Sequence, residues 1–281
     1  MSILRQYKSD DLVGRYAIDT HPRPEDFNMH IHDKYEISYF ISVKGEYTVE
    51  GTPYPIFPGC VIISRPSETH GARISPDREY ERCVINFSEN VLKAIDPERK
   101  LLRAFDNRPL GRGNLYLAKE LDKTALLRAI GGLRLEDENG YNNRLEVLSR
   151  LFITLHLIDK AYKGRGDTEY MPPQNLNERI VMYVNEHLFE SITVTDIAER
   201  FFLSRSQFSR VFKYTTGATP WEYITLKRLN AARDMMKDGV SAQRACESCG
   251  FGDYSAFYRA YTKHFGISPR NDGENMTKRP F

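Results

Sequence analysis

Cysteine is scarce in this sequence. Only four of the 281 residues are cysteines, at positions 60, 83, 246 and 249. A chain of this length is stable without disulfide bonds, so we expect all four thiols to be reduced. Cys246 and Cys249 form a CxxC pair, but no second cysteine or histidine pair at ligand spacing accompanies it. We therefore interpret these two cysteines as small buried residues of a helix.

Long apolar runs are also missing. The longest one, residues 151–158, contains a histidine and is far shorter than the roughly 20 residues of a membrane-spanning helix. The N-terminal sequence MSILRQYKSD is polar and lacks the apolar core of a signal peptide. These absences predict a soluble, cytoplasmic protein with no membrane partner.

Neither sign of charge is in large excess. The sequence has 40 Lys and Arg against 38 Asp and Glu, a formal net charge of +2, which excludes a polycation that coats nucleic acid. Any contact with DNA must therefore depend on the placement of a few basic side chains. The length and the 41% of hydrophobic residues are sufficient for two domains with separate cores.

Short β-rich runs separated by glycine and proline occupy residues 35–87. The runs are YEISYFISV, EYTVEG, YPIF, CVIISR and ERCVINF. Several short strands at this spacing predict an all-β sandwich or barrel. We expect this domain to cover residues 1–90 and to enclose a cavity for a small organic ligand.

Three histidines and one glutamate form a candidate site in this region. His30 and His32 alternate in an extended segment, so both imidazoles point the same way, and Glu36 lies an even number of residues further on. With His70 from a neighbouring strand, these side chains would suit a divalent metal. The alternative is a pocket that binds a small organic effector through the same four side chains together with Tyr35, Tyr39 or Arg65.

Two segments resemble the motifs of the cupin fold. HIHDKYE is similar to the first cupin motif, and PGCVIISRPSETH to the second, with Gly59, Pro66 and His70 in the expected order. The spacing from Glu36 to Gly45 is longer than in cupin enzymes, and no asparagine follows His70 closely. The resemblance therefore implies a cupin-like barrel in which the histidines bind metal or only line a pocket.

The middle of the chain has helical periodicity. Apolar residues recur at helical spacing over residues 91–105, 122–135 and 144–162, and the loop DENGYNN precedes the last of these helices as the turn of a hairpin. The apolar stripe of residues 144–162 must be covered by the barrel, by a partner helix or by a second subunit. We interpret residues 91–162 as a helical connector that also serves in dimerisation, and residues 163–174, with two glycines and a Pro pair, as a linker.

The C-terminal region, residues 175–275, shows a helix-turn-helix pattern that occurs twice. A helix is predicted over residues 177–188 from its apolar residues on one face, and further helices are predicted after Thr193, Ser204 and Thr219-Pro220, where capping residues precede the apolar pattern. Phe208, Arg210 and Phe212 recur forty-nine positions later as Phe257, Arg259 and Tyr261. The second copy has a turn at residues 250–252 and a helix over residues 253–265. The region is thus predicted to be an all-α domain with two helix-turn-helix units.

This region resembles the DNA-binding domain of the AraC/XylS family of transcriptional regulators. The matching residues are Ile197, Ala198, Phe208, Arg210, Phe212, Lys213, Gly217, Pro220, Arg228 and Ala232 in the first part, and Gly250, Phe251, Phe257, Arg259, Tyr261, Phe265, Gly266, Ser268 and Pro269 in the second. Ala245, Cys246, Arg244 and Thr262 depart from the family pattern. The resemblance covers residues 177–270.

The resemblance implies that the second helix of each unit lies in a major groove of DNA. The implied DNA-facing residues are Ser206, Gln207, Ser209, Arg210 and Lys213 in the first unit, and Tyr254, Ser255, Ala256, Tyr258 and Arg259 in the second. Lys213, Lys227, Arg228 and Lys263 are candidates for phosphate contacts.

We therefore expect a two-domain transcriptional activator. A cupin-like sensor would bind a small molecule such as a sugar, and the helical domain would bind promoter DNA, with RNA polymerase and a second copy of the chain as partners. One alternative is a metal-dependent cupin enzyme with an accessory DNA-binding domain. Another is a constitutive DNA-binding protein whose barrel only dimerises.

Overall fold

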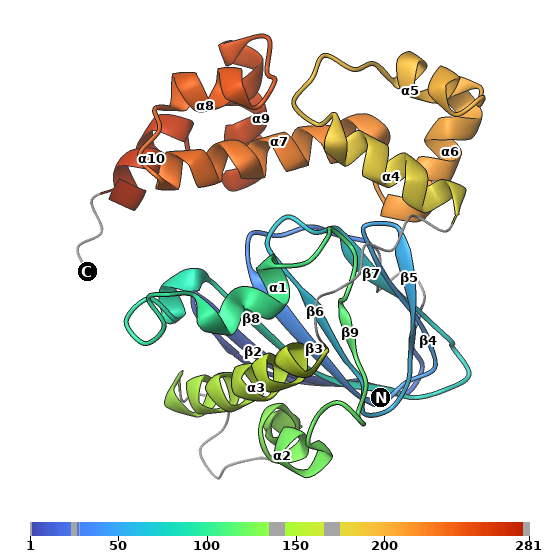
Figure 1. The fold of residues 1–281 in the computed structure, drawn as a ribbon, viewed down its shortest axis with the longest axis vertical. Coiled ribbons are helices and arrows are strands. Elements are labelled where there is room, and N and C mark those ends of the chain that lie inside the picture. Colours follow the sequence, from blue (N-terminus) through green and yellow to red (C-terminus); the bar gives the residue numbers. More distant parts are fainter. Residues whose placement is uncertain (1, 24–26, 28, 135–143, 166–174, 278–281) are drawn as a thin grey trace. The chain divides into compact units, whose positions relative to one another are not determined.

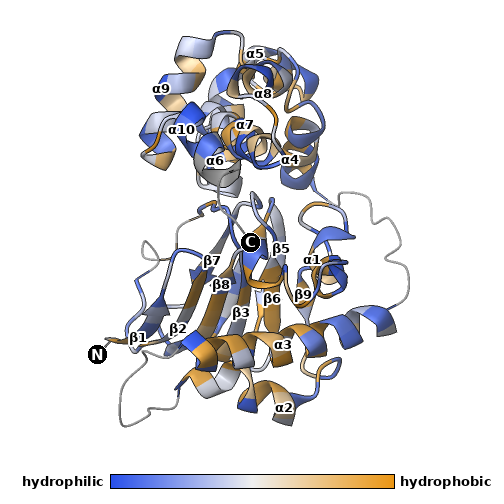
Figure 2. Ribbon diagram, turned by 90° about the vertical axis from the view of Figure 1, so that its left-hand side faces the viewer, coloured by the Kyte–Doolittle hydropathy of each residue, from blue (hydrophilic) through white to orange (hydrophobic). Residues whose placement is uncertain are grey.

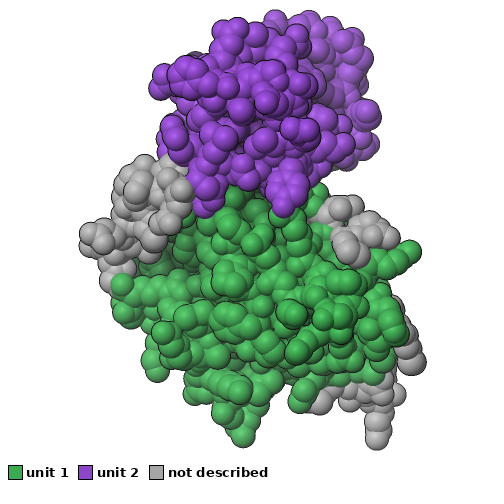
Figure 3. Space-filling view, turned by 90° about the vertical axis from the view of Figure 1, so that its right-hand side faces the viewer, with its two compact units in different colours: residues 1–172 green, residues 173–281 purple. Residues whose placement is uncertain are grey.

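The computed structural model describes residues 2–23, 27, 29–134, 144–165 and 175–277. The chain divides into two compact units, Met1–Pro172 and Pro173–Phe281, which are coloured separately in Figure 3. The predicted hairpin turn at residues 137–143 and residues 166–174 of the predicted linker lie outside the described residues. In the part of the chain that the structure describes, no helix has the length and apolar character needed to cross a membrane.

The first unit is built from two antiparallel sheets (Figure 1). The strands are β1 (Ser2–Lys8), β2 (Leu12–Asp19), β3 (Tyr35–Ser42), β4 (Gly45–Val49), β5 (Thr52–Ile56), β6 (Val61–Ser64), β7 (His70–Ile74), β8 (Tyr80–Phe87) and β9 (Leu115–Tyr116). One sheet has the order β1-β2-β8-β3-β6-β9, and the other has the order β5-β4-β7. The predicted β-sheet domain followed by a helical segment is confirmed, and β1, β2 and β9 were not predicted.

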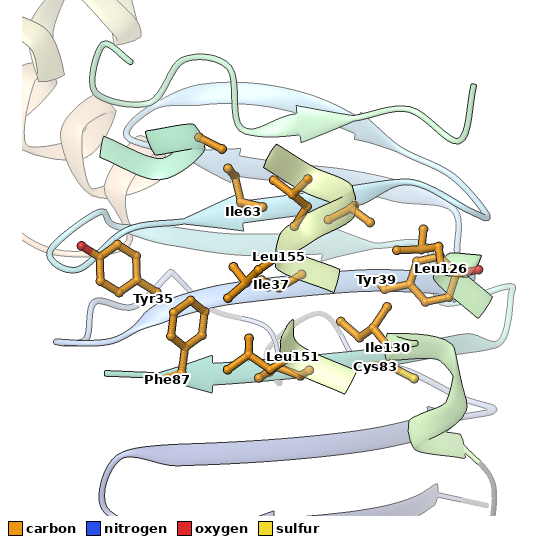
Figure 4. Packing of buried hydrophobic residues seen from close by; sticks show 14 of the residues in the cluster. Tyr35, Ile37, Tyr39, Ile63, Cys83, Phe87, Leu126, Ile130, Leu151 and Leu155 are labelled. Carbon is orange, nitrogen blue, oxygen red and sulfur yellow. The ribbon is translucent and has the colours of Figure 1, made fainter. Parts of the chain in front are cut away.

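The central strand β3 is buried on both faces. Because side chains alternate along a strand, Tyr35, Ile37 and Tyr39 belong to one apolar cluster, while Phe40 belongs to another that includes Tyr47 of β4. Figure 4 shows the first set packed against residues of helices in the same unit. The second face, which lies toward the smaller sheet, carries Glu36.

Helices and turns of the first unit cover one face of the larger sheet. They are η2 (Glu89–Val91), η3 (Lys100–Leu102), α1 (Arg103–Asp106), α2 (Lys123–Arg128), η4 (Ile130–Arg134) and α3 (Arg144–Gly164). The predicted helix over residues 91–105 is wrong as one helix. Pro97 has no N–H and disfavours helical backbone at Asp96, and the Asp96 carboxylate instead accepts the N–H groups of Lys100 and Leu101.

Helix α3 is the main cover of the sheet. Val147, Leu151, Leu155 and Ile158 are at most 1% exposed and share the core of β3 and β8, and Figure 2 shows the apolar colouring of these strands and of α3. Leu145, which the sequence pattern placed on the buried stripe, is 69% exposed. The barrel-like sheet itself therefore covers this stripe.

The second unit is entirely helical in its described residues, as predicted. Its helices are α4 (Leu176–Glu186), α5 (Val194–Arg200), α6 (Arg205–Thr216), α7 (Pro220–Lys237), α8 (Ala242–Ser248), α9 (Tyr254–Phe265) and α10 (Pro269–Thr277). Capping boxes at Thr193, Ser204 and Thr219 begin α5, α6 and α7. Two separate apolar clusters form, one around Phe208 and Phe212 and one with the corresponding aromatic residues of α9. Helix α10 was not predicted.

Candidate functional site

The structure brings His30, His32, Glu36 and His70 together. One ligand atom from each side chain lies within 4.8 Å of the others. His30 and His70 exchange backbone N–H to carbonyl hydrogen bonds of 2.9 Å each, which attaches the segment before β3 to the start of β7. His70 and Glu36 are buried, His32 is half-buried and His30 is exposed. The cluster therefore reaches from solvent into the interior between the sheets.

The Glu36 carboxylate is held by three neutral donors that the sequence did not reveal. Oε1 accepts hydrogen bonds from Ser38 Oγ at 2.9 Å and from Tyr47 OH at 3.1 Å, and Oε2 accepts one from Asn86 Nδ2 at 2.7 Å. His32 Nε2 lies 3.2 Å from Oε2. These donors fix the orientation of the carboxylate, as outer-shell groups do around metal ligands.

The hydrogen bonds of His70 define its tautomer. Nδ1 lies 2.8 Å from the carbonyl oxygen of Glu68, and because a carbonyl can only accept, Nδ1 carries the proton. Nε2 is buried and has no hydrogen-bond partner within the described ranges, and it lies 3.7 Å from Glu36 Oε2. Buried side-chain nitrogen atoms in proteins usually have a hydrogen-bond partner, and His70 Nε2 has none among the described residues.

Burial and charge oppose each other at this cluster. Burial raises the pKa of Glu36, but the charge of His70 and the hydrogen bond and charge of His32 outweigh it, so the pKa lies well below its ordinary value. Burial lowers the pKa of His70, but Glu36 outweighs this effect and the pKa is raised. The set of three imidazoles and one ionised carboxylate fits the donor preference of a divalent transition metal.

The other predicted ligand-binding residues do not join this cluster. Tyr35 and Tyr39 lie one and three positions from Glu36, so their side chains are on the opposite face of β3 (Figure 4). The Tyr35 hydroxyl donates to the Asp106 carboxylate at 3.2 Å. Arg65 donates from Nη1 to the backbone carbonyls of Asp106 and Arg108. Its guanidinium therefore holds the segment at the end of α1 in this structure.

A buried ion pair supports the backbone next to His70. Arg108 donates to both carboxylate oxygens of Glu68, at 2.8 and 2.7 Å, and both side chains are at most 1% exposed. Burial raises the pKa of Glu68, but the Arg108 guanidinium outweighs it and lowers the pKa to about 2. Gly111 N and Asn114 Nδ2 donate to the same carboxylate. This network fixes the backbone of Glu68, whose carbonyl oxygen accepts the hydrogen bond from His70 Nδ1.

The second unit presents two equivalent helices with polar surfaces. On α6 the predicted DNA-facing residues Ser206, Gln207, Arg210 and Lys213 are exposed and Ser209 is half-buried; on α9, Ser255, Ala256, Tyr258 and Arg259 are exposed and Tyr254 is half-buried. Gln207 also closes the capping box of α6, since its Oε1 accepts from the Ser204 N–H at 2.9 Å. Arg210 and Arg259 make neither an ion pair nor a hydrogen bond to any part of the chain that the structure describes.

The spacing of these side chains places them on one face of each helix. Ser206 and Arg210 are four residues apart, as are Ser255 and Arg259, so each pair lies on one surface. Phe208 and Phe257, which lie between the members of each pair, are fully buried. The aromatic residues are thus core, and they orient the polar faces outward.

Two of the predicted phosphate contacts are not accessible. Lys213 and Lys263 are exposed, whereas Lys227 and Arg228 are 5% and 7% exposed. Arg228 donates three hydrogen bonds to backbone carbonyls within the unit. The prediction of a phosphate contact for Arg228 is therefore wrong, because its guanidinium is used inside the protein.

Comparison with known proteins gives two family matches. A model of the AraC-like ligand binding domain matches residues 12–152, and a model of a helix-turn-helix domain matches residues 197–273. The HTH-type transcriptional activator RhaS of Escherichia fergusonii is 27% identical over 254 residues, which cover 87% of this chain and 86% of that protein. RhaS of Yersinia pestis is 25% identical over 259 residues, which cover 91% and 92%. The crystal structure of ToxT from Vibrio cholerae O395 is 17% identical, covers 99% of this chain and 98% of its own, and aligns with a TM-score of 0.37.

Proposed function

Since this chain belongs to the AraC family of transcriptional regulators, we propose that it activates transcription when a small polar effector, such as a sugar, binds in its first unit. The family consists of regulators and not enzymes, so the alternative of a metal-dependent cupin enzyme is set aside. The proposal of an activator is supported by the names of the relatives from Escherichia fergusonii and Yersinia pestis. RNA polymerase at the promoter and a second copy of the chain are the proposed protein partners.

The observation that carries the DNA-binding part is the paired polar face. Ser206 and Arg210 on α6 match Ser255 and Arg259 on α9, and both arginines are exposed. An arginine on such a helix can form a bidentate pair with guanine or contact a phosphate. Helix α7, which joins the two helix-turn-helix halves of the second unit, has 18 residues and is about 27 Å long at ~1.5 Å per residue. Two helices held in this way suit two adjacent major grooves of one duplex.

For the first unit we propose that His30, His32, Glu36 and His70 hold a divalent metal beside the effector. The proposal is supported by the 4.8 Å cluster of donor atoms and by the buried Nε2 of His70. A bound metal would supply a positive centre for hydroxyl or carboxylate oxygens of an effector. The protein's own groups then fix its ligands, since Asn86 and Tyr47 hold Glu36 and the Glu68 carbonyl holds His70.

The test is selection of bound sequences from random duplex DNA, followed by affinity measurements on the selected site. We expect Arg259→Ala to weaken binding by about 1–3 kcal/mol if it contacts a base, and to relax the preference at one position. Lys237→Ala, which removes an exposed charge at the end of α7, is the control and should bind as the wild type does. Failure of the wild-type chain to enrich any sequence would contradict the proposed function.

A further inference from the structure

One buried arginine lies where the two helix-turn-helix halves meet. Arg228 belongs to α7, between Ile224, which packs in the core of the first half, and Leu229, which packs in the core of the second. The buried apolar residues of the two halves form separate clusters. Among the described residues, the halves are therefore joined by α7 and by polar contacts across it, not by one shared core.

Arg228 connects both halves through its guanidinium. Nε donates to Leu188 O and Nη2 to Glu190 O, both in the loop between α4 and α5, and Nη1 donates to Gly250 O in the turn between α8 and α9. Each hydrogen bond is 2.7 Å long. A guanidinium is planar and its donors have a fixed geometry. These three bonds therefore fix a loop of the first half and a turn of the second relative to the same point on α7.

The loop and the turn are also in direct contact. A Cβ atom added to Gly250 would lie 2.5 Å from the carbonyl oxygen of Phe189. Gly250 has a φ of +75°, which a residue with a side chain adopts only with strain. Gly252 of the same turn has open space around it. The close approach is thus confined to the point where Arg228 binds.

We propose that Arg228 is a positioning residue that sets the distance and rotation between the reading helices α6 and α9. The inference rests on the proposed function, because it concerns how the two helices address one duplex. A rigid connection places the second helix over its groove once the first has bound, which raises its effective concentration there. The ligand that this arrangement selects is a duplex with two major-groove elements at one fixed spacing.

The experiment compares wild type, Arg228→Ala and Arg228→Lys as full-length chains on the selected DNA site. Three duplexes are used: the intact site, the site with one base pair inserted between its two elements, and a site with only one element. The insertion turns the second groove by about a tenth of a helical turn. We expect it to cost the wild type at least about tenfold in affinity, as loss of the second, linked contact predicts.

Arg228→Ala should bind the intact site about tenfold more weakly and should lose most of the insertion penalty, because flexible halves are no longer preorganised. Arg228→Lys keeps the charge but cannot reach three carbonyls, and should lie between the two. Binding to the single element should stay within about twofold of wild type, which separates positioning from general loss of fold.

Gly250→Ala is a second test of the same proposal. It disturbs the close contact between the turn at Gly250 and the carbonyl oxygen of Phe189, and it keeps Arg228. It should also reduce the insertion penalty. The proposal would be overturned if the insertion penalty of Arg228→Lys and Gly250→Ala equalled that of the wild type, or if the wild type tolerated the insertion. A wild-type chain that selects no site at all would instead refute the proposed function.

Discussion

Phe202 shows how a single residue can carry backbone strain in the turn between α5 and α6. It follows α5, has a φ of +56° and is 97% exposed. The N–H of Leu203 donates to Ala198 O, and in the second helix-turn-helix half the N–H of Phe251 donates to Cys246 O in the same way. This is the helix-ending motif in which glycine is favoured. Gly250 has that position in the second helix-turn-helix half, whereas the first half has Phe202.

We expect Phe202→Gly to stabilise the second unit. Removal of the left-handed strain of about 1–2 kcal/mol outweighs the larger unfolded-state entropy of glycine, about 0.5–1 kcal/mol, and the exposed ring loses little packing. The free energy of unfolding should rise by roughly 0.5–1 kcal/mol in urea titrations. Phe189→Gly, at a half-exposed position without positive φ, is the control and should destabilise. A lower midpoint for Phe202→Gly would refute the strain.

At the residue scale, the alternation of side chains along a strand explains which of the predicted site residues lie together in the structure. His30, His32 and Glu36 are an even number of positions apart and meet in one cluster. Tyr35 and Tyr39 are an odd number of positions from Glu36 and lie on the other face of β3. Strict use of strand alternation would have excluded both tyrosines. Asn86 and Tyr47 could not be predicted to touch Glu36, since they come from other strands whose register is not written in the local sequence.

At the element scale, α3 tests whether the sheet covers the helix. Leu155 is fully buried against the sheet, and Ile153 on the same helix is 49% exposed. We expect Leu155→Ala to lower the free energy of unfolding by about 2–5 kcal/mol, and Ile153→Ala by less than about 0.5 kcal/mol. Thermal and denaturant melts of the two variants measure this difference. Equal losses would mean that another surface, such as a second subunit, buries Ile153.

The elements that the sequence predicted well are those with strong local signals. Helices α5, α6 and α7 begin at Thr193, Ser204 and Thr219, whose side chains cap them. Strand β1 was missed because each of its sides mixes apolar and polar residues, with Ile3, Arg5 and Tyr7 half-buried on one side and Leu4, Gln6 and Lys8 exposed on the other. Helix α10 was missed because its polar sequence has no apolar stripe; its Asp272 instead binds Tyr261 OH and Arg233 Nε. That stabilisation comes from tertiary contacts.

At the scale of the whole molecule, we expect a bound cation to stabilise the folded state of the first unit. A ligand that binds only the folded state stabilises it by about 2.7 kcal/mol at one hundred times its dissociation constant. We therefore expect addition of Zn²⁺ or Mn²⁺ to the chelator-treated chain to raise the melting temperature of one transition. His70→Ala should abolish the shift, and metal analysis should find one equivalent in the wild type only.

The control for this measurement is His156→Ala, which removes an exposed histidine of α3 outside the cluster. It should bind metal as the wild type does. If neither cation shifts the melting temperature of the wild type, the His/Glu cluster is a polar lining of the effector pocket and not a metal site.

The most direct test of the whole account is guanine methylation interference on the selected DNA site. One chain should show two groups of major-groove contacts whose centres lie about 10–10.5 base pairs apart. Arg259→Ala should remove contacts from one group, and Arg210→Ala from the other. A single continuous group, or loss of both groups in either variant, would contradict the claim that α6 and α9 read two grooves.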